Sequence, residues 1–155
     1  FDLDPFPARL LVVGGGYIAC EFASIFNGLG SRVTQLYRGE QVLRGFDEEV
    51  RHFIAGEMTK TGIDLRLKAD VASIKRTAEG LLVSLNHGET LMADQVLYAT
   101  GRIPNVDSMG LKAAGVAQGE DGAILVNDHY QTNLPSVFAL GDVTSRIQLL
   151  SLIHI

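Results

Sequence analysis

The chain has 155 residues, of which 46% are hydrophobic and 17 are glycines, a composition typical of one compact α/β protein with many tight turns. Its formal net charge of −5 gives no electrostatic support for binding nucleic acid or an anionic membrane surface. No apolar run approaches the roughly 18 residues of a membrane span. The single Cys20 excludes an internal disulfide, which favours a reducing compartment such as the cytoplasm.

The first regular pattern follows a short segment, residues 1–7, whose two prolines and two aspartates are typical of a connector. An apolar run at 10–13 then predicts a buried parallel strand, which leads directly into Gly14-x-Gly16-x-x-Ala19. A helix is predicted next, because large apolar residues recur at helical spacing on one face: Ile18, Phe22, Ile25, Phe26 and Leu29.

Glycines end this helix and residues 33–37 predict a second strand, so that residues 8–38 form the strand–helix–strand fingerprint of a dinucleotide site. Gly14 allows the tight turn out of the strand, and Gly16 lets the backbone approach a pyrophosphate without a Cβ in the way. Ala19 replaces the third glycine and permits close packing of helix on sheet. The helix N-terminus then offers N–H groups and a positive dipole end to phosphates.

A loop at 38–46 precedes a second predicted helix, in which Asp47 is the N-cap and two glutamates occupy the first turn. We expect this helix to end at Gly62 and to bury four apolar residues: Val50, Phe53, Ile54 and Met58. Residues 63–67 alternate apolar and polar side chains and predict a third strand.

Short strands are predicted at 71–76, 81–86 and 90–92, and turn signals between them indicate an antiparallel meander. The chain returns to the parallel sheet at 95–99, and the loop 100–105 should lie near the glycine-rich turn, because ligands bind at the carboxyl ends of parallel strands. A short amphipathic segment at 109–114 and two strand-like runs, 124–126 and 137–140, complete the pattern. The predicted fold is α/β, a Rossmann-like parallel sheet with an inserted antiparallel β-meander.

Three motifs in register resemble a known family: Gly-Gly-Gly-Tyr-Ile-Ala-x-Glu-Phe-Ala at 14–23, Ala-Thr-Gly-Arg-x-Pro-Asn at 99–105 and Val-Phe-Ala-Leu-Gly-Asp at 137–142. Their order and spacing are similar to those of the flavin-dependent pyridine-nucleotide disulfide oxidoreductases, over residues 8–149. The loop with Leu-Arg-Gly-Phe-Asp at 43–47 most resembles the glutathione reductases of that family.

The resemblance implies an NADPH-binding domain inserted into an FAD domain, with electrons passing from nicotinamide through flavin to a disulfide. It implies a connector from the FAD domain at 1–7, the NADPH-binding domain at 8–117 and a return segment into the FAD domain at 118–149. Residues 150–155 depart from the family pattern and are interpreted as a non-native tail. The intact enzyme would be a homodimer that reduces glutathione disulfide. Its redox cysteines and acid–base histidine lie outside this chain, so we expect the fragment to bind NADPH without being active.

The resemblance also implies residue roles. Tyr17 resembles the aromatic gate of the nicotinamide pocket, Glu21 a carboxylate near the nicotinamide and flavin, and Asp142 the acceptor of a hydrogen bond from the flavin's ribityl chain. Gly101 and Arg102 resemble a second cofactor-contacting loop. The complete set of predicted cofactor-binding residues is Gly14, Gly16, Tyr17, Ile18, Ala19, Glu21, Arg38, Arg44, Gly101, Arg102, Gly141 and Asp142.

The choice of NADPH over NADH follows from the end of the second strand. An NAD site places a carboxylate there to bind the ribose 2′-OH, whereas this chain has Tyr37, followed by Arg38 and, six residues later, Arg44. Two charged hydrogen bonds of roughly 1.5–3 kcal/mol each would favour NADPH by a factor on the order of 10² to 10⁴. Glu40 lies between the two arginines and would temper this preference if it faced them.

Other interpretations of the same residues remain open. Glycine-rich turns also occur without a dinucleotide, Tyr17 and Glu21 suit an ordinary helix surface, and Asp142 suits a turn after a strand. Cys20 is assigned no role, and the histidines lack the spacing of a metal site: His52, His87, His129 and His154. The functional alternatives are a lipoamide-dehydrogenase-like enzyme that uses NAD, another disulfide or metal-ion reductase, and a non-catalytic module that senses dinucleotide redox state.

Overall fold

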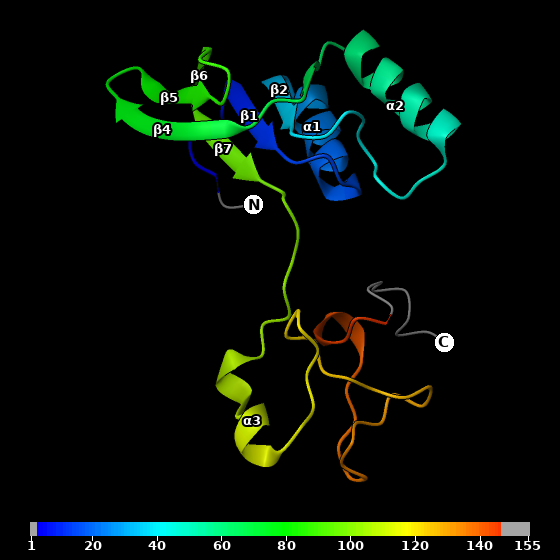
Figure 1. The fold of residues 1–155 in the computed structure, drawn as a ribbon. Coiled ribbons are helices and arrows are strands. Elements are labelled where there is room, and N and C mark those ends of the chain that lie inside the picture. Colours follow the sequence, from blue (N-terminus) through cyan, green and yellow to red (C-terminus); the bar gives the residue numbers. More distant parts are fainter. Residues whose placement is uncertain (1–2, 147–155) are drawn as a thin grey trace. The chain divides into compact units, whose positions relative to one another are not determined.

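The computed structural model describes residues 3–146, and the predicted non-native tail at 150–155 lies outside them. The chain folds as two compact units, one through Gly101 and the other from Arg102 onward (Figure 1). The sequence-based boundary between an NADPH-binding domain and a return segment lies later, after residue 117. Which cofactor each unit serves stays a prediction.

A four-stranded parallel sheet is the centre of the first unit, and it confirms the predicted Rossmann-like arrangement. It contains β1 (Arg9–Val13), β2 (Arg32–Tyr37), β3 (Asp64–Leu67) and β7 (Gln95–Tyr98), in the order β3-β2-β1-β7 (Figure 1). All neighbouring strands are parallel, and Val13 near the end of β1 lies opposite Leu36 of β2 and Tyr98 of β7. The carboxyl ends of these strands therefore meet at one edge of the sheet, where α/β proteins bind ligands.

Helix α1 (Tyr17–Gly28) packs on the sheet through small residues rather than large ones. Its buried residues are Ala19, Cys20 and Ala23, because short side chains let the helix axis approach the strands closely. The predicted stripe of large apolar residues is therefore buried only in part: Phe26 packs against the core, whereas other members face solvent. Ile25 and Leu29, for example, are 52% and 66% exposed.

Helix α2 (Glu48–Lys60) begins and ends where the sequence predicts. The Asp47 carboxylate accepts hydrogen bonds from the backbone N–H groups of Glu49 and Val50, and Gly62 after the helix has a left-handed φ of 98°. The predicted burial of this helix is wrong for Val50 and Phe53, which are 45% and 66% exposed.

The second helix packs beside the edge strand β3, which explains that correction. Met58 is the only buried residue of α2. Ile54 and Ala55 are half-buried and pack against the same hydrophobic core as Met58, which includes Leu10 and Val12 of β1. A helix at a sheet edge covers only one flank of its apolar stripe, so the other flank is left in solvent.

The predicted antiparallel meander is confirmed as β4 (Val71–Thr77), β5 (Gly80–Leu85) and β6 (Thr90–Ala93). Alternate residues of β1 divide between the two faces of the parallel sheet. Leu10 and Val12 pack with the helices, whereas Leu11 and Val13 pack with the meander. The sheet is thus covered on both faces, as an all-parallel sheet requires.

The second unit is built mostly from loops. Its described helical segments are η1 (Asp107–Met109), α3 (Leu111–Ala114) and η2 (Gly141–Val143). The predicted strands at 124–126 and 137–140 are wrong, because Ile124 and Phe138 form only isolated bridges.

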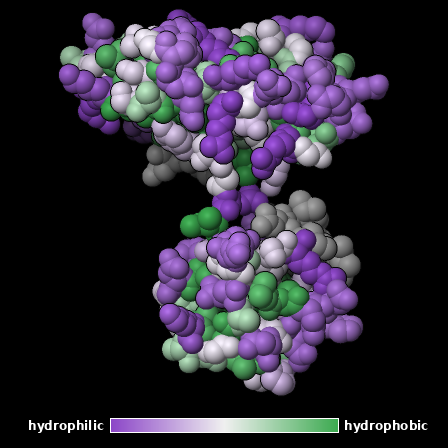
Figure 2. All heavy atoms as spheres, in the orientation of Figure 1, coloured by the Kyte–Doolittle hydropathy of each residue, from purple (hydrophilic) through white to green (hydrophobic). Residues whose placement is uncertain are grey.

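Only part of each run is buried: Ile124 and Ala139 join Val106 and Val116 in a small core, through irregular backbone. The side chains next to them in the sequence are exposed: Leu125, Phe138 and Leu140. The backbone N–H of Ile124 donates to the Val143 carbonyl, 2.8 Å away, rather than to a neighbouring strand. Hydrophobic side chains also gather on the face of this unit drawn in Figure 2. The large hydrophobic residues of the second unit that are exposed to solvent include Ile103 and Leu140, at 83% and 67% exposure.

Between residues 3 and 146, no helix combines the length and the apolar character needed to cross a membrane.

Candidate functional site

The turn after β1 requires glycine at position 14. Gly14 has a φ of 144°, and a Cβ there would lie 2.3 Å from the carbonyl oxygen of Ala99, which follows β7. The same Cβ would lie 3.3 Å from the Cβ of Ala19, and the Gly14 N–H donates to the Leu36 carbonyl. Gly14 therefore lets the end of β1, the start of α1 and the end of β7 approach one another closely.

Gly16 faces open space and is the N-cap of α1. A Cβ built on Gly16 would meet no atom within 4 Å. The residue has an extended backbone, with φ −81° and ψ 175°, and no side chain among the described residues caps the helix here. A helix N-terminus with an open approach and no side-chain cap is suited to an anion such as a pyrophosphate. The turn therefore fits the phosphates of a dinucleotide.

Gln35 of β2 holds this turn by a hydrogen bond to its backbone, a contact that the sequence did not predict. Its side chain is fully buried in β2, and its Nε2 donates to the Gly14 carbonyl over 3.0 Å and lies 3.6 Å from the Cys20 Sγ. Within the described chain, its Oε1 has no hydrogen-bond partner. The only sequence signal was a long polar residue in an otherwise apolar strand. Burial raises the pKa of the Cys20 thiol, so the thiol stays protonated.

Tyr37, at the carboxyl end of β2, packs against two glycines. A Cβ on Gly15 would lie 2.3 Å from the Tyr37 Cγ, and a Cβ on Gly39 would lie 2.6 Å from its Cε1. The ring thus connects the glycine-rich turn to the loop that follows β2. The sequence analysis used Tyr37 only as a position without a carboxylate, since contacts between distant segments are not visible in a local motif.

Arg38 and Arg44 both lie exposed in that loop. Between residues 3 and 146, neither side chain has an ion pair or hydrogen bond. Glu40 is instead paired with Lys68, whose Nζ lies 2.9 Å from its Oε1, and this hydrogen bond lowers the pKa of Glu40. The acid between the two arginines is therefore engaged by a different cation.

Tyr17 and Glu21 lie on the first half of α1, four residues apart, and so share a helix face. Tyr17 is 40% exposed and Glu21 is also exposed. The intervening Ile18 is half-buried, and Ala19 is fully buried against the sheet. Of these four predicted cofactor-binding residues, Tyr17 and Glu21 are therefore accessible to a ligand. Ile18 and Ala19 are more buried and serve packing.

The remaining predicted residues lie at and beyond the end of the first unit. Gly101 ends that unit with a φ of 130°. In the second unit, the Arg102 Nε lies 3.5 Å from the Asp142 Oδ2, and Gly141 begins η2 with a φ of 77°. Two residues predicted to contact cofactors, Arg102 and Asp142, are thus close enough to form an exposed ion pair.

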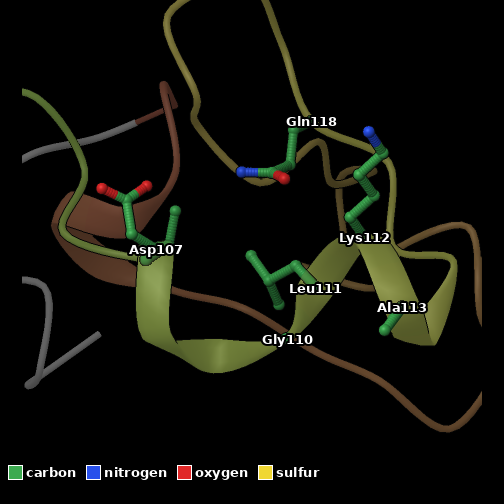
Figure 3. A pocket seen from close by; sticks show the side chains of 7 residues that line it. Asp107, Gly110, Leu111, Lys112, Ala113 and Gln118 are labelled. Atoms are coloured by element: carbon green, nitrogen blue, oxygen red, sulfur yellow. The ribbon is translucent and has the colours of Figure 1, made fainter.

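A pocket in the second unit has a volume of about 530 Å³ and involves none of the predicted site residues. It is lined by residues between Val106 and Gln118. Figure 3 shows the side chains of Leu111, from α3, and Gln118 facing the same space. No group of three His, Cys, Asp or Glu residues that could hold a metal ion is found in the part of the chain that the structure describes, and His154 lies outside it.

Comparison with known proteins decides the family. The family model described as pyridine nucleotide-disulphide oxidoreductase matches residues 1–152, nearly the whole chain. The chain belongs to this family. The pyridine nucleotide-disulphide oxidoreductases use FAD and a nicotinamide cofactor, so the family agrees with the glycine-rich turn and open helix N-terminus described above.

Within this family, the chain is similar to proteins with different substrates. It is 50% identical to the glutathione reductase of Burkholderia cepacia, over 96% of this chain and 33% of that protein. It is 38% identical to the mercuric reductase of Lysinibacillus sphaericus, over 92% of this chain and 27% of that protein. The solved structure of the HOCl-induced flavoprotein disulfide reductase RclA from Escherichia coli matches with a TM-score of 0.88 and 35% identity, over 96% of this chain and 34% of that one.

The chain therefore spans about a third of the length of the curated glutathione reductase that it matches. Its family is one of oxidoreductases, and its similarity to a solved flavoprotein disulfide reductase agrees with that family.

Proposed function

We propose that this chain is the NADPH-binding portion of a flavin-dependent disulfide reductase most like glutathione reductase, and that it is inactive by itself. The first unit would hold the pyrophosphate with Gly14, Gly16 and the N-terminus of α1, while Ala19 keeps that helix close to the sheet. Tyr17 and Glu21 would contact the nicotinamide end. The intact enzyme would be a cytoplasmic homodimer that reduces glutathione disulfide.

The NADPH assignment rests mainly on the charged side chains of the loop after β2. Its two arginines, Arg38 and Arg44, are exposed and make no ion pair with described residues, while Glu40 is engaged by Lys68. At the end of β2, where an NAD site has a carboxylate for the ribose 2′-OH, this chain has Tyr37. The two guanidiniums that follow would then be available to a 2′-phosphate.

The second unit would contribute to the flavin side. There Asp142, after Gly141, would accept a hydrogen bond from the ribityl chain of FAD. Gly101, the last residue of the first unit, and Arg102, the first of the second, would form the second cofactor-contacting loop. FAD, when bound, would supply the redox chemistry between NADPH and a disulfide. This chain's own residues would bind and orient the two cofactors.

The similarity to a mercuric reductase favours one alternative, that the parent enzyme reduces a metal ion instead of glutathione disulfide. We expect the residues that contact either substrate to lie outside the proposed cofactor site. Sequencing the parent gene and assaying the full-length enzyme with both substrates separates these alternatives, and we expect glutathione disulfide to be the better substrate.

The proposal is tested with the purified chain of 155 residues. We expect NADPH titration to show binding, the visible spectrum to show no flavin, and glutathione disulfide to cause no NADPH oxidation. A chain that did not bind NADPH would contradict the proposal. Material that carried flavin and reduced glutathione disulfide would contradict the inactivity of the fragment.

A further inference from the structure

The loop after β2, residues 38–46, is held in place although it contains no helix or strand; we call it the arginine loop. Val42 and Leu43 are its buried members, with 0% and 6% exposure. Leu43 has a φ of 57°, which a leucine adopts only when its surroundings impose it. Its N–H donates to the Gly15 carbonyl over 2.6 Å, which connects the loop to the glycine-rich turn.

Arg51, in the first half of α2, holds the middle of the same loop. Its Nε donates to the Val42 carbonyl and its Nη2 to the Gln41 carbonyl, each over 2.8 Å. Its Nη1 pairs with the Glu48 Oε2 at 2.5 Å, and the side chain is only 18% exposed. One planar guanidinium thus connects two successive backbone carbonyls to the helix, a geometry that lysine cannot reproduce.

These two carbonyls lie between Arg38 and Arg44 in the sequence, so fixing them limits the freedom of both arginines' backbone. Such preorganisation favours binding, because less conformational entropy is lost when a ligand engages the loop. Arg51 itself is occupied, since all three of its guanidinium nitrogens have partners.

We propose that Arg51 is a positioning residue for recognition of the 2′-phosphate, acting through the arginine loop and not by touching the cofactor. This role rests on the proposed function, because it requires Arg38 and Arg44 to bind that phosphate. It explains why α2, which is poorly buried, presents an arginine rather than an apolar residue to the loop.

The test compares NADPH and NADH, which differ only in the 2′-phosphate, by calorimetric titration of the whole chain. Arg51→Met keeps the length of the side chain but removes the hydrogen bonds. It should weaken NADPH binding about three- to tenfold and change NADH binding less than about twofold. Arg51→Lys keeps the charge without the planar fork, and should retain an NADPH defect smaller than that of Arg51→Met.

The matched control is Glu48→Gln, which breaks the ion pair of Arg51 but leaves its bonds to the two carbonyls. We expect it to keep both affinities within about twofold of the wild type. Thermal unfolding of each variant is measured alongside, so that a variant that does not fold is recognised. If Arg51→Met does not fold, the NADPH and NADH affinities of Arg51→Lys decide whether the inference holds.

Equal losses for NADPH and NADH would overturn the inference, because they indicate a general structural role. Unchanged NADPH affinity in Arg51→Met, or full recovery in Arg51→Lys, would overturn it too. If NADPH preference depended on Arg38 and Arg44 but not on Arg51, this inference alone would be wrong. A wild-type chain that bound neither dinucleotide would contradict the proposed function itself.

Discussion

Gly15 and Gly16 are neighbours in the glycine-rich turn, yet each is glycine for a different reason. Gly15 has a backbone conformation open to any residue, but its missing Cβ makes room for the Tyr37 ring. Gly16 has no protein atom in the space beside its missing Cβ. The first glycine therefore serves packing, and the second leaves the N-terminus of α1 open, where we propose that the pyrophosphate binds.

We expect Gly15→Ala to destabilise the fold by about 1–3 kcal/mol, because its methyl group would lie 2.3 Å from the Tyr37 Cγ and the ring must shift. Denaturant unfolding of the chain measures this change. An unfolding midpoint equal to that of the wild type would show that the ring does not constrain Gly15.

Gly16→Ala should have the opposite profile. The free energy of unfolding should change by less than about 1 kcal/mol, because the poorer N-cap and the less flexible unfolded chain act in opposite directions. NADPH affinity should fall by about tenfold or more, since the new methyl group would occupy the approach of the pyrophosphate. Undiminished NADPH binding in this variant would place the pyrophosphate elsewhere.

At this scale, the sequence predicted the residues whose roles depend on near neighbours. The positions of Gly14, Gly16 and Ala19 follow from a local motif. The contacts of Gln35 and Arg51 were not predicted, because each joins segments that only the tertiary fold brings together. Gln35 lies 21 residues from the Gly14 carbonyl that it supports.

Among the elements, the ion pair of Arg9 and Asp94 helps to connect the two sheets of the first unit. The Arg9 guanidinium, at the start of β1, binds the Asp94 carboxylate between β6 and β7, with an Nη2–Oδ1 distance of 2.6 Å. The same Nη2 donates to the Glu79 carbonyl in the turn of the meander. The Arg9 backbone N–H also donates to Asp94, over 2.7 Å.

The hydrogen bonds from Arg9 lower the pKa of Asp94, the side-chain bond most of all. A lowered folded-state pKa adds stability above the unfolded pKa of about 3.9, and this stability is lost as the pH falls through the folded value. Asp94→Asn should therefore lower the free energy of unfolding at pH 7, modestly because both side chains are about one-third exposed.

Urea unfolding of both proteins between pH 7 and pH 3 measures the effect, and the difference should shrink below about pH 4. A difference that stayed constant with pH would mean that the charge of Asp94 is unimportant.

The elements themselves were largely predictable where their pattern was long and periodic. Strands of the sheet and meander follow from apolar runs and turn residues, and α2 follows from its N-cap and its terminal glycine. The burial of Val50 and Phe53 was wrong, because periodicity does not reveal that α2 lies at the sheet edge. The runs at 124–126 and 137–140 were too short to separate a strand from a buried loop.

For the molecule as a whole, the chain carries two compact units and about a third of the length of a related glutathione reductase. Family membership extends over both units, whereas the glycine-rich turn and the arginine loop, which we propose bind NADPH, lie in the first. The order of motifs along the sequence allowed the family to be predicted, but nothing local marked the division between Gly101 and Arg102. That division depends on how many contacts cross it, which is a property of the folded chain.

The central claim is that the first unit binds NADPH through two arginines at its 2′-phosphate. Its most direct test is titration of the wild type and of the Arg38→Glu, Arg44→Ala double variant with NADPH and NADH. We expect the wild type to favour NADPH by on the order of 10² to 10⁴, and the double variant to lose most of that preference while NADH affinity is maintained. If the double variant bound NADPH as tightly as the wild type, the claim would be contradicted.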